Sequence, residues 1–210
     1  MLVIWFSQTY DRPMFTGIIK ATSTVLEHKK QGDLLQITFE KPKDWHFSVG
    51  DSIATNGVCL TVKDIHSDSY TAELMNETLE KSSFGKKIPH VVNLEPSLTL
   101  QDFLGGHMVQ GHVDTIGVIS ERIDEQGSSR ITVDIDNLDQ TLVIPKGSIT
   151  LDGISLTIVD VGTHSISVSL VDYTLKNTIA GANWRVGETV NVEYDILGKY
   201  ITRYMKHTRP

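Results

Sequence analysis

Hydrophobic and polar positions alternate with a period of two along much of the chain, which is the pattern of half-buried β-strands. The clearest stretch is 131–135, where Ile131, Val133 and Ile135 alternate with polar residues. Similar runs are separated by polar turn clusters such as HKKQGD, IDEQG, HSDS and GTHS. Many short strands with frequent turns predict an all-β protein, and closure into barrels would remove exposed sheet edges.

Each half of the chain is predicted to contain two hairpin-like units. The expected strand regions are 17–27, 34–40, 52–65 and 70–75 in the first half, and 112–122, 130–136, 148–161 and 165–171 in the second. Short helical turns are expected near Glu77 and Tyr173, each with a possible N-cap before it and a glycine beyond its end. These flanking residues are Asn76 and Gly85 for the first turn, and Asp172 and Gly181 for the second.

A longer helix is predicted at the end of the chain, over residues 197–207. Leu197, Ile201, Tyr204 and Met205 fall on one face of it. This apolar stripe must be covered, either by a barrel of the same chain or by another subunit.

The two halves repeat each other. Residues 52–85 match residues 148–181 without a gap at a shift of 96, with about one third of the positions identical and most others similar. The period suits a small domain rather than a solenoid unit. We therefore expect two copies of one barrel with two related binding sites, with boundaries at 14–106 and 107–196.

Composition and charge narrow the class of protein. A formal net charge of -7 disfavours binding to nucleic acid or to an anionic membrane surface. The single cysteine excludes an internal disulfide and fits a reducing compartment. Residues 1–13 make a poor signal peptide and lie outside the repeat. They are expected to be a poorly ordered extension before a start at Met14, or alternatively an edge strand or subunit contact.

Six motifs in order resemble riboflavin synthase, over nearly the whole chain from Met14 to about Arg203. They are MFTGII, NGVCLTV, MNETL, LGGHMVQGHVD, LDGISLT and VNVEYDILGKYI. The resemblance implies two tandem six-stranded Greek-key barrels and a C-terminal helix that joins three chains into a homotrimer. It also implies a cytoplasmic transferase without metal or cofactor, and lumazine synthase as a candidate partner.

The reaction implied by the resemblance is a dismutation. One 6,7-dimethyl-8-ribityllumazine donates a four-carbon unit to a second one, giving riboflavin and 5-amino-6-ribitylamino-pyrimidinedione. Two like substrates must then be held face to face, and proximity can supply much of the rate. In the family this site lies between the N-terminal barrel of one subunit and the C-terminal barrel of a neighbour.

The resemblance gives five candidates for catalysis, which are Ser52, Cys59, His112, Lys146 and Asp195. Each has a structural alternative: Cys59 can be a small core residue, Lys146 a solvated turn residue and Asp195 a helix N-cap. A reactive thiol at Cys59 would need a lowered pKa. The neighbouring position that carries a second cysteine in some relatives is Val58 here.

His107 lies near His112 in GGHMVQGH, but the spacing of five does not favour one face of a strand. We favour His112 for function and expect His107 to be a linker residue hydrogen-bonded to backbone. A zinc site from Cys59 and these histidines would lack the usual ligand spacing.

The resemblance also implies substrate-binding segments in both halves. In the first half these are Gly17, Ile18, Ile19, Cys59, Leu60, Thr61, Glu73, Leu74, Met75, Asn76, Glu77 and Thr78. In the second half they are Gly111, His112, Val113, Lys146, Ser155, Leu156, Thr157, Ser169, Leu170, Val171, Asp172, Tyr173 and Thr174. Asp172 replaces a proline that is usual in the family, so the shape of the second pocket is open. Threonines at 61 and 157 are also simply common in strands.

Two other functions are compatible with the same fold. A lumazine or flavin antenna protein would bind without turnover, and a barrel used only for assembly would leave the paired motifs unexplained.

Overall fold

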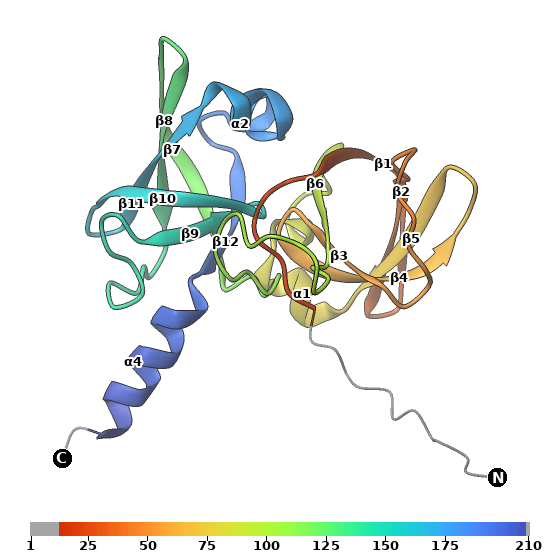
Figure 1. Cartoon of the computed structure of the whole chain (residues 1–210), viewed down its shortest axis with the longest axis horizontal. Helices are drawn as coiled ribbons and strands as arrows, with labels where there is room; N and C mark the ends of the chain where they lie inside the picture. The colour runs from red at the N-terminus through yellow and green to blue at the C-terminus, as the bar shows by residue number, and fades with distance from the viewer. Residues whose placement is uncertain (1–12, 209–210) are drawn as a thin grey trace.

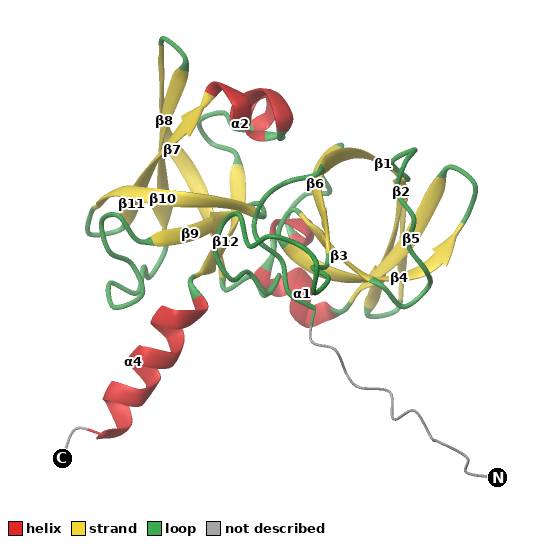
Figure 2. Ribbon diagram, in the orientation of Figure 1, coloured by secondary structure: helices red, strands yellow, loops and turns green. Residues whose placement is uncertain are grey.

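Residues 13–208 are described by the computed structural model of the chain. They form two closed antiparallel barrels that lie side by side, with a C-terminal helix projecting from the second (Figure 1). Figure 2 shows that strands dominate both barrels. The predicted fold of two six-stranded barrels and a terminal helix is therefore confirmed. Residues 1–12, and with them most of the predicted extension, lie outside the described part.

The two barrels have equivalent strand orders, β1-β2-β5-β4-β3-β6 and β7-β8-β11-β10-β9-β12. The strands of barrel 1 are β1 (Ala21–Gln31), β2 (Leu34–Glu40), β3 (Ser52–Thr55), β4 (Val58–Ile65), β5 (Ser69–Leu74) and β6 (Val91–Pro96). Those of barrel 2 are β7 (Thr115–Glu125), β8 (Ser128–Ile135), β9 (Ser148–Leu151), β10 (Ile154–Val161), β11 (Ser165–Val171) and β12 (Thr189–Tyr194). Corresponding strands even share their irregularities, since β1 and β7 are each bulged against the next strand.

The predicted strand boundaries need three corrections. Strands β1 and β7 begin at Ala21 and Thr115, so residues 17–20 and 112–114 precede them. The turns after β1 and β7 are shorter than HKKQGD and IDEQG, because Gly32 and Gly127 supply the positive φ of a tight turn. The predicted strand 52–65 is divided by a turn at Asn56 and Gly57, with φ of 45° and 75°. The second half divides in the same way between β9 and β10. The apolar positions change from odd to even numbers across both turns, and Asn-Gly and Asp-Gly are typical of two-residue hairpin turns, so the sequence carried a signal that the prediction missed.

The short helices begin one residue earlier than predicted. Helix α1 spans Asn76–Lys81 and α2 spans Asp172–Asn177. Asn76 and Asp172 are therefore not N-caps, and neither cap position makes a side-chain capping bond. Instead the Asn76 amide donates to Glu80, and Asp172 pairs with Lys176 one turn further on.

Glycine is needed after these helices for space. A Cβ at Gly85, the last residue of η1 (Ser83–Gly85), would lie 2.0 Å from the carbonyl oxygen of Leu79. A Cβ at Gly181, inside α3 (Ala180–Asn183), would lie 2.0 Å from that of Leu175. The duplicated glycines thus allow a turn of chain to pack directly on each short helix.

A symmetric set of hydrogen bonds joins the barrels. Asn93 of β6 donates from Nδ2 to the carbonyl of Asp152, and Asn191 of β12 donates from Nδ2 to the carbonyl of Asn56. Their side-chain oxygens accept the backbone N–H of Ile179 and of Ser83 in the opposite half. Because all four residues in the first two bonds are buried, these bonds form a specific contact between the barrels.

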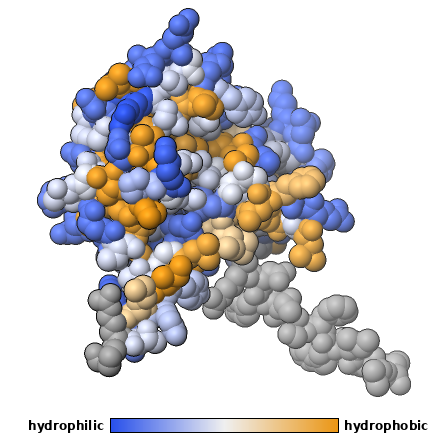
Figure 3. Space-filling view, turned by 60° about the vertical axis from the view of Figure 1, so that its left-hand side comes forward, coloured by the Kyte–Doolittle hydropathy of each residue, from blue (hydrophilic) through white to orange (hydrophobic). Residues whose placement is uncertain are grey.

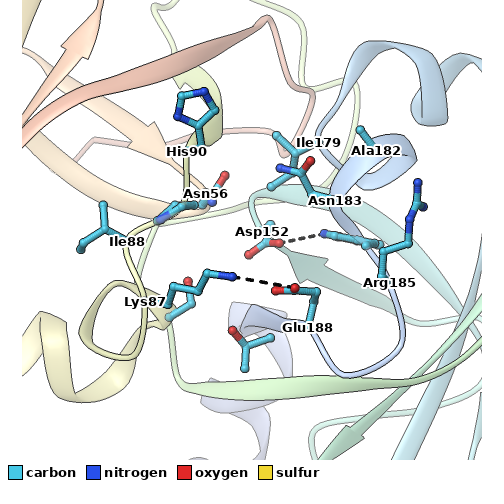
Figure 4. Close-up of a pocket in the computed structure, with 14 residues that line it drawn as sticks. Asn56, Lys87, Ile88, His90, Asp152, Ile179, Ala182, Asn183, Arg185 and Glu188 are labelled. Atoms are coloured by element: carbon cyan, nitrogen blue, oxygen red, sulfur yellow. Dashed lines mark hydrogen bonds and ion pairs between the residues drawn. The ribbon is translucent and has the colours of Figure 1, made fainter.

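One member of this set differs between the halves. Asp152 stands where the first repeat has Asn56, and its second carboxyl oxygen accepts the indole N–H of Trp184 at 2.8 Å (Figure 4). Its first oxygen accepts the backbone N–H of Asn191. At the position corresponding to Trp184, the first repeat has Ile88, which has no donor. The second repeat therefore has both the carboxylate and the indole N–H that it accepts, and the first repeat has neither.

Stability should depend on pH through Asp152. Complete burial raises its pKa from 3.8 to about 7, although both hydrogen bonds oppose the rise. Between these values the folded state holds a proton that the unfolded chain releases, so this contribution is full below pH 4 and is lost as pH rises through 7. Asp152→Asn cannot titrate. The free energy of unfolding of wild type relative to this variant should therefore fall by up to about 1.4 kcal/mol per pH unit in that window. Urea denaturation from pH 4 to 8 measures this, and a difference independent of pH would contradict it.

Helix α4 (Ile196–Thr208) starts from a fixed base. The Asp195 carboxylate accepts the backbone N–H of Leu197, and Lys199 pairs with Asp114 at 2.6 Å. Beyond this base no residue of the helix is buried, and Ile201 and Tyr204 are 59% and 70% exposed. Figure 3 shows apolar side chains along the projecting helix. Within the described chain, residues 140–144 of barrel 2 lie beside the first turns of the helix, but the predicted stripe stays largely exposed.

Candidate functional site

The first segment of each repeat forms part of the opposite barrel. The Gly17 carbonyl accepts the backbone N–H of Ser155 at 2.8 Å, and the Gly111 carbonyl accepts that of Cys59 at 2.9 Å. A Cβ on either glycine would lie 2.6 Å from the Cβ of the residue it faces. Ile19 likewise packs on the core of barrel 2. The predicted binding segments 17–19 and 111–113 are thus exchanged between the barrels.

Two buried glutamates hold these segments. Glu95 of β6 accepts the backbone N–H groups of Thr16 and Gly17 at 2.8 and 2.9 Å. Glu193 of β12 accepts those of Gln110 and Gly111 at the same two distances. Burial raises the pKa of both carboxyls, while these hydrogen bonds lower it. Each glutamate fixes a segment that walls the other barrel. Sequence reasoning missed both, although they are repeated as NLEP and NVEY.

A cavity of about 220 Å³ lies where the 111–113 segment meets barrel 1. Its lining combines β4, α1 and the exchanged segment: Val58, Cys59, Glu77, Thr78, Lys81, Gly111, His112 and Val113. Five of the predicted binding residues therefore come together with His112, and Cys59 with His112 unites two of the predicted catalytic ones. Lys81 was not predicted. It lies three residues after Thr78 on α1, a spacing that places both on one helix face.

The thiol in this cavity is not activated in the free protein. Burial raises the pKa of Cys59, the negative charge of Glu193 adds to the rise, and a hydrogen bond with Ser52 opposes it. The cysteine is therefore mostly the neutral thiol at pH 7, which does not meet the condition stated for a nucleophile. It can still contact a ligand or exchange a proton with Ser52.

Alkylation by iodoacetamide should report this state. Cys59 should react more slowly than a free thiol at pH 7.5, since only the thiolate attacks, and the rate should rise steeply above pH 9. A ligand that fills the cavity should protect the thiol. Cys59→Ser should reduce turnover more than binding, and equal loss of both would make Cys59 part of the pocket wall. Mass spectrometry suffices, because the chain has one cysteine.

The corresponding position of barrel 2 has a different partner. The His107 ring contacts the Ser155 hydroxyl at 2.7 Å through Nδ1 and the Thr150 hydroxyl at 3.1 Å through Nε2. The expected hydrogen bond of His107 to backbone is present, from its backbone N–H to the Thr16 carbonyl, but the ring also bonds to two side chains that the sequence did not predict. Within one chain the two histidines lie at different barrels, His107 at Ser155 and His112 at the Cys59 cavity.

Lys146 and Asp195 lie in barrel 2, away from the Cys59 cavity. Lys146 has a φ of 71° at the position where the first repeat has Gly50, a conformation that side chains rarely adopt. Asp195 caps α4, and its charge also raises the pKa of His107, although burial of the ring lowers that pKa more. Asp195 thus both caps helix α4 and raises the pKa of the His107 ring.

The segments predicted to border the ribityl chain lie on β5–α1 and β11–α2. Glu73 pairs with Lys63 at 2.5 Å, and Tyr173 is 74% exposed. Thr78 lines the cavity, and Thr174 is at the equivalent position of α2. Their contacts with a ligand stay predictions.

A second cavity, of about 430 Å³, lies at the barrel junction and is drawn in Figure 4. Asp152 bonds to Trp184 at its floor, and Lys87 faces Glu188 at 3.9 Å across it. It contains none of the predicted catalytic residues, so we assign the candidate site to the Cys59 cavity. Among residues 13–208 no group of three or more His, Cys, Asp or Glu side chains is arranged to hold a metal. None of the described helices is long and apolar enough to cross a membrane.

Two barrels with exchanged wall segments and a cysteine or serine at the same point define a duplicated ligand-binding protein. The Lumazine binding domain family model matches twice, at residues 16–97 and 110–195. Riboflavin synthases of Actinobacillus pleuropneumoniae and Bacillus subtilis are 41% and 40% identical, each match covering 91% of this chain and 90% of the relative. That of Mycobacterium tuberculosis is 40% identical over 92% of this chain and 98% of its own. The chain belongs to the riboflavin synthase family and is an enzyme, a transferase.

Solved structures show the same fold. LumP complexed with 6,7-dimethyl-8-(1'-D-ribityl) lumazine superposes with a TM-score of 0.77 at 21% identity, covering 85% of this chain and 98% of that one. LumP complexed with riboflavin gives 0.78 at 21% identity, covering 86% and 98%. At this identity the likeness concerns the fold alone.

Proposed function

We propose that the chain converts two molecules of 6,7-dimethyl-8-ribityllumazine into riboflavin and 5-amino-6-ribitylamino-pyrimidinedione by transfer of a four-carbon unit. The observation that carries this proposal is the duplicated exchange, in which each barrel receives a wall segment from the other repeat, together with the cavity that this exchange forms at Cys59. Such a pair of related sites suits a reaction between two like molecules. Riboflavin synthases at about 40% identity over about 90% of the chain support it further.

The residues divide the work as follows. Backbone groups of the exchanged segments would hold the flat ring, with Gly111 and His112 beside Cys59, and Gly17 beside Ser155. Thr78 and Thr174 would border the ribityl chains. Cys59 with Ser52, and His112, are the candidates for proton transfer at the N-terminal barrel. Lys146 and Asp195 would act from the C-terminal barrel.

The proposed assembly is a homotrimer in which the N-terminal barrel of one subunit meets the C-terminal barrel of the next. The exposed apolar face of α4 supports it, because such a face favours burial against another chain. Light scattering should give three chains. Ile201→Glu should lower this number and turnover together, whereas Lys206→Glu, in the last turn of the helix, serves as the charge control. We further propose a cytoplasmic location, which the single cysteine suits, and lumazine synthase as the partner that supplies substrate.

Turnover with a single substrate tests the function. The protein is incubated with the lumazine alone, and riboflavin is followed by its absorbance. One riboflavin should form for every two lumazines consumed. The alternative, a non-catalytic antenna protein, is less supported, because LumP shares the fold at only 21% identity. Stoichiometric binding without riboflavin formation would establish that alternative and reject the enzyme.

A further inference from the structure

Barrel 2 contains a chain of three hydrogen-bonding side chains that barrel 1 lacks. It runs from Ser155 on β10 through the His107 ring to Thr150 on β9. In the first repeat the corresponding residues are Cys59, Pro13 and Ala54. Ala54 pairs with Cys59 across β3 and β4 as Thr150 pairs with Ser155 across β9 and β10. All three members are therefore specific to one barrel, although the backbone is duplicated.

The linker between the barrels is built to bring His107 to this place. Gly106 passes so close to Ser155 that a Cβ on it would lie 2.9 Å from the hydroxyl oxygen and 2.1 Å from the Thr16 carbonyl. The next backbone N–H, that of His107, donates to the same carbonyl at 3.2 Å. The ring is thus fixed at the serine by the backbone as well as by its own two bonds.

The direction of the hydrogen bonds follows from Thr150. This residue is 1% exposed, and the His107 Nε2 is the partner its hydroxyl has within the described chain. A buried hydroxyl that did not donate its hydrogen would lose a bond, so Thr150 donates to Nε2. Nδ1 then carries the hydrogen of a neutral ring and donates to the Ser155 oxygen. Burial, which lowers the pKa of His107, favours this neutral state. The hydrogen of the Ser155 hydroxyl is left free to point elsewhere.

We propose that His107 is a positioning residue that holds Ser155 as a hydrogen-bond donor toward the ligand of the C-terminal barrel. This inference rests on the proposed function. Two identical substrates would meet a thiol in one barrel and an oriented hydroxyl in the other. A ring that loses a proton from its methyl group spreads negative charge over its nitrogens and oxygens, which a fixed donor stabilises. The hydrogen-bonded residues Ser155, His107 and Thr150 thereby give the C-terminal barrel a fixed donor that the N-terminal barrel lacks.

Kinetics of conservative variants test the role. His107→Phe keeps a ring but removes both nitrogens and should lower kcat about 10- to 100-fold with KM changed less than about threefold. Ser155→Ala should match it, and the double variant should be no worse than either. His107→Asn keeps an N–H near Nδ1 and should recover about tenfold over His107→Phe while staying below wild type. His66→Asn, in an exposed turn, is the control. Asn and Phe variants with equal loss, or a loss that follows the unfolding temperature, would overturn the proposal.

Imidazole nitrogen NMR tests the geometry independently of turnover. His107 should be neutral with its hydrogen on Nδ1, and Thr150→Val, which keeps the shape but removes the donor, should mix the two tautomers. A hydrogen on Nε2 in wild type would overturn the proposal even if riboflavin is made. Absence of riboflavin formation by wild type would instead reject the proposed function. In that case, titration with the lumazine would still decide whether Ser155→Ala weakens binding as a lost donor should.

Discussion

Replacing Glu193 by glutamine is expected to lower riboflavin formation about 10- to 100-fold while the protein stays folded. The carboxylate accepts two backbone N–H groups, from Gln110 and Gly111, and an amide can accept only one of them. The other would face an N–H₂ group, and an unsatisfied buried donor costs about 1–3 kcal/mol. The segment that carries His112 would then leave its place beside Cys59.

The matched variant is Glu95→Gln, which loosens the 16–17 segment beside Ser155 instead. If both pockets are required, each variant should lose turnover but keep one pocket. Riboflavin titration followed by fluorescence should then give about half the wild-type stoichiometry in either case. Glu27→Gln, on an exposed part of β1, controls for the loss of a charge. Turnover at the wild-type level in either buried variant would show that the exchanged walls are not needed.

Replacing Gly57 by alanine should destabilise the whole protein by about 2–4 kcal/mol. Gly57 has a φ of +75°, and a Cβ there would lie 2.6 Å from the backbone nitrogen of Gly153. Both atoms belong to rigid turns at the junction, so neither can move without breaking the bonds of Asn93 and Asn191. For a chain of this size the unfolding temperature should fall by about 5–15 °C.

The variant Gly32→Ala measures the cost of a positive φ alone, without the steric clash that a Cβ at Gly57 would make. Gly32 also has a positive φ, +61°, but nothing lies within 4 Å of a Cβ there. Gly32→Ala should lower the free energy of unfolding by about 1 kcal/mol, because an alanine is strained at a positive φ. Calorimetry on both variants gives the difference, which measures the contact between the barrels. Equal losses of stability in the two variants would mean that the turns at the junction can move apart without a cost in free energy.

Sequence reasoning reached the architecture because duplication and alternation are properties of the chain itself. The two barrels and the terminal helix confirm it, and Cys59 and Thr78, both predicted to bind the substrate, line one cavity. Spacing cannot tell which barrel a segment joins, so the exchange of 17–19 and 111–113 was hidden. Likewise, the partners of the His107 ring, Ser155 and Thr150, lie more than 40 residues away along the chain, so spacing could not predict them.

The exchanged segments limit what a shorter chain could do. A polypeptide with only the first repeat would hold the 16–17 strip on Glu95 but would have no Gly111 to complete the hollow at Cys59. It could regain that missing wall only by binding a second copy of itself, with the first segment of each copy packed against the barrel of the other. A protein with a single repeat would therefore need to dimerise to complete its cavity, whereas the duplicated chain makes the same exchange within one polypeptide.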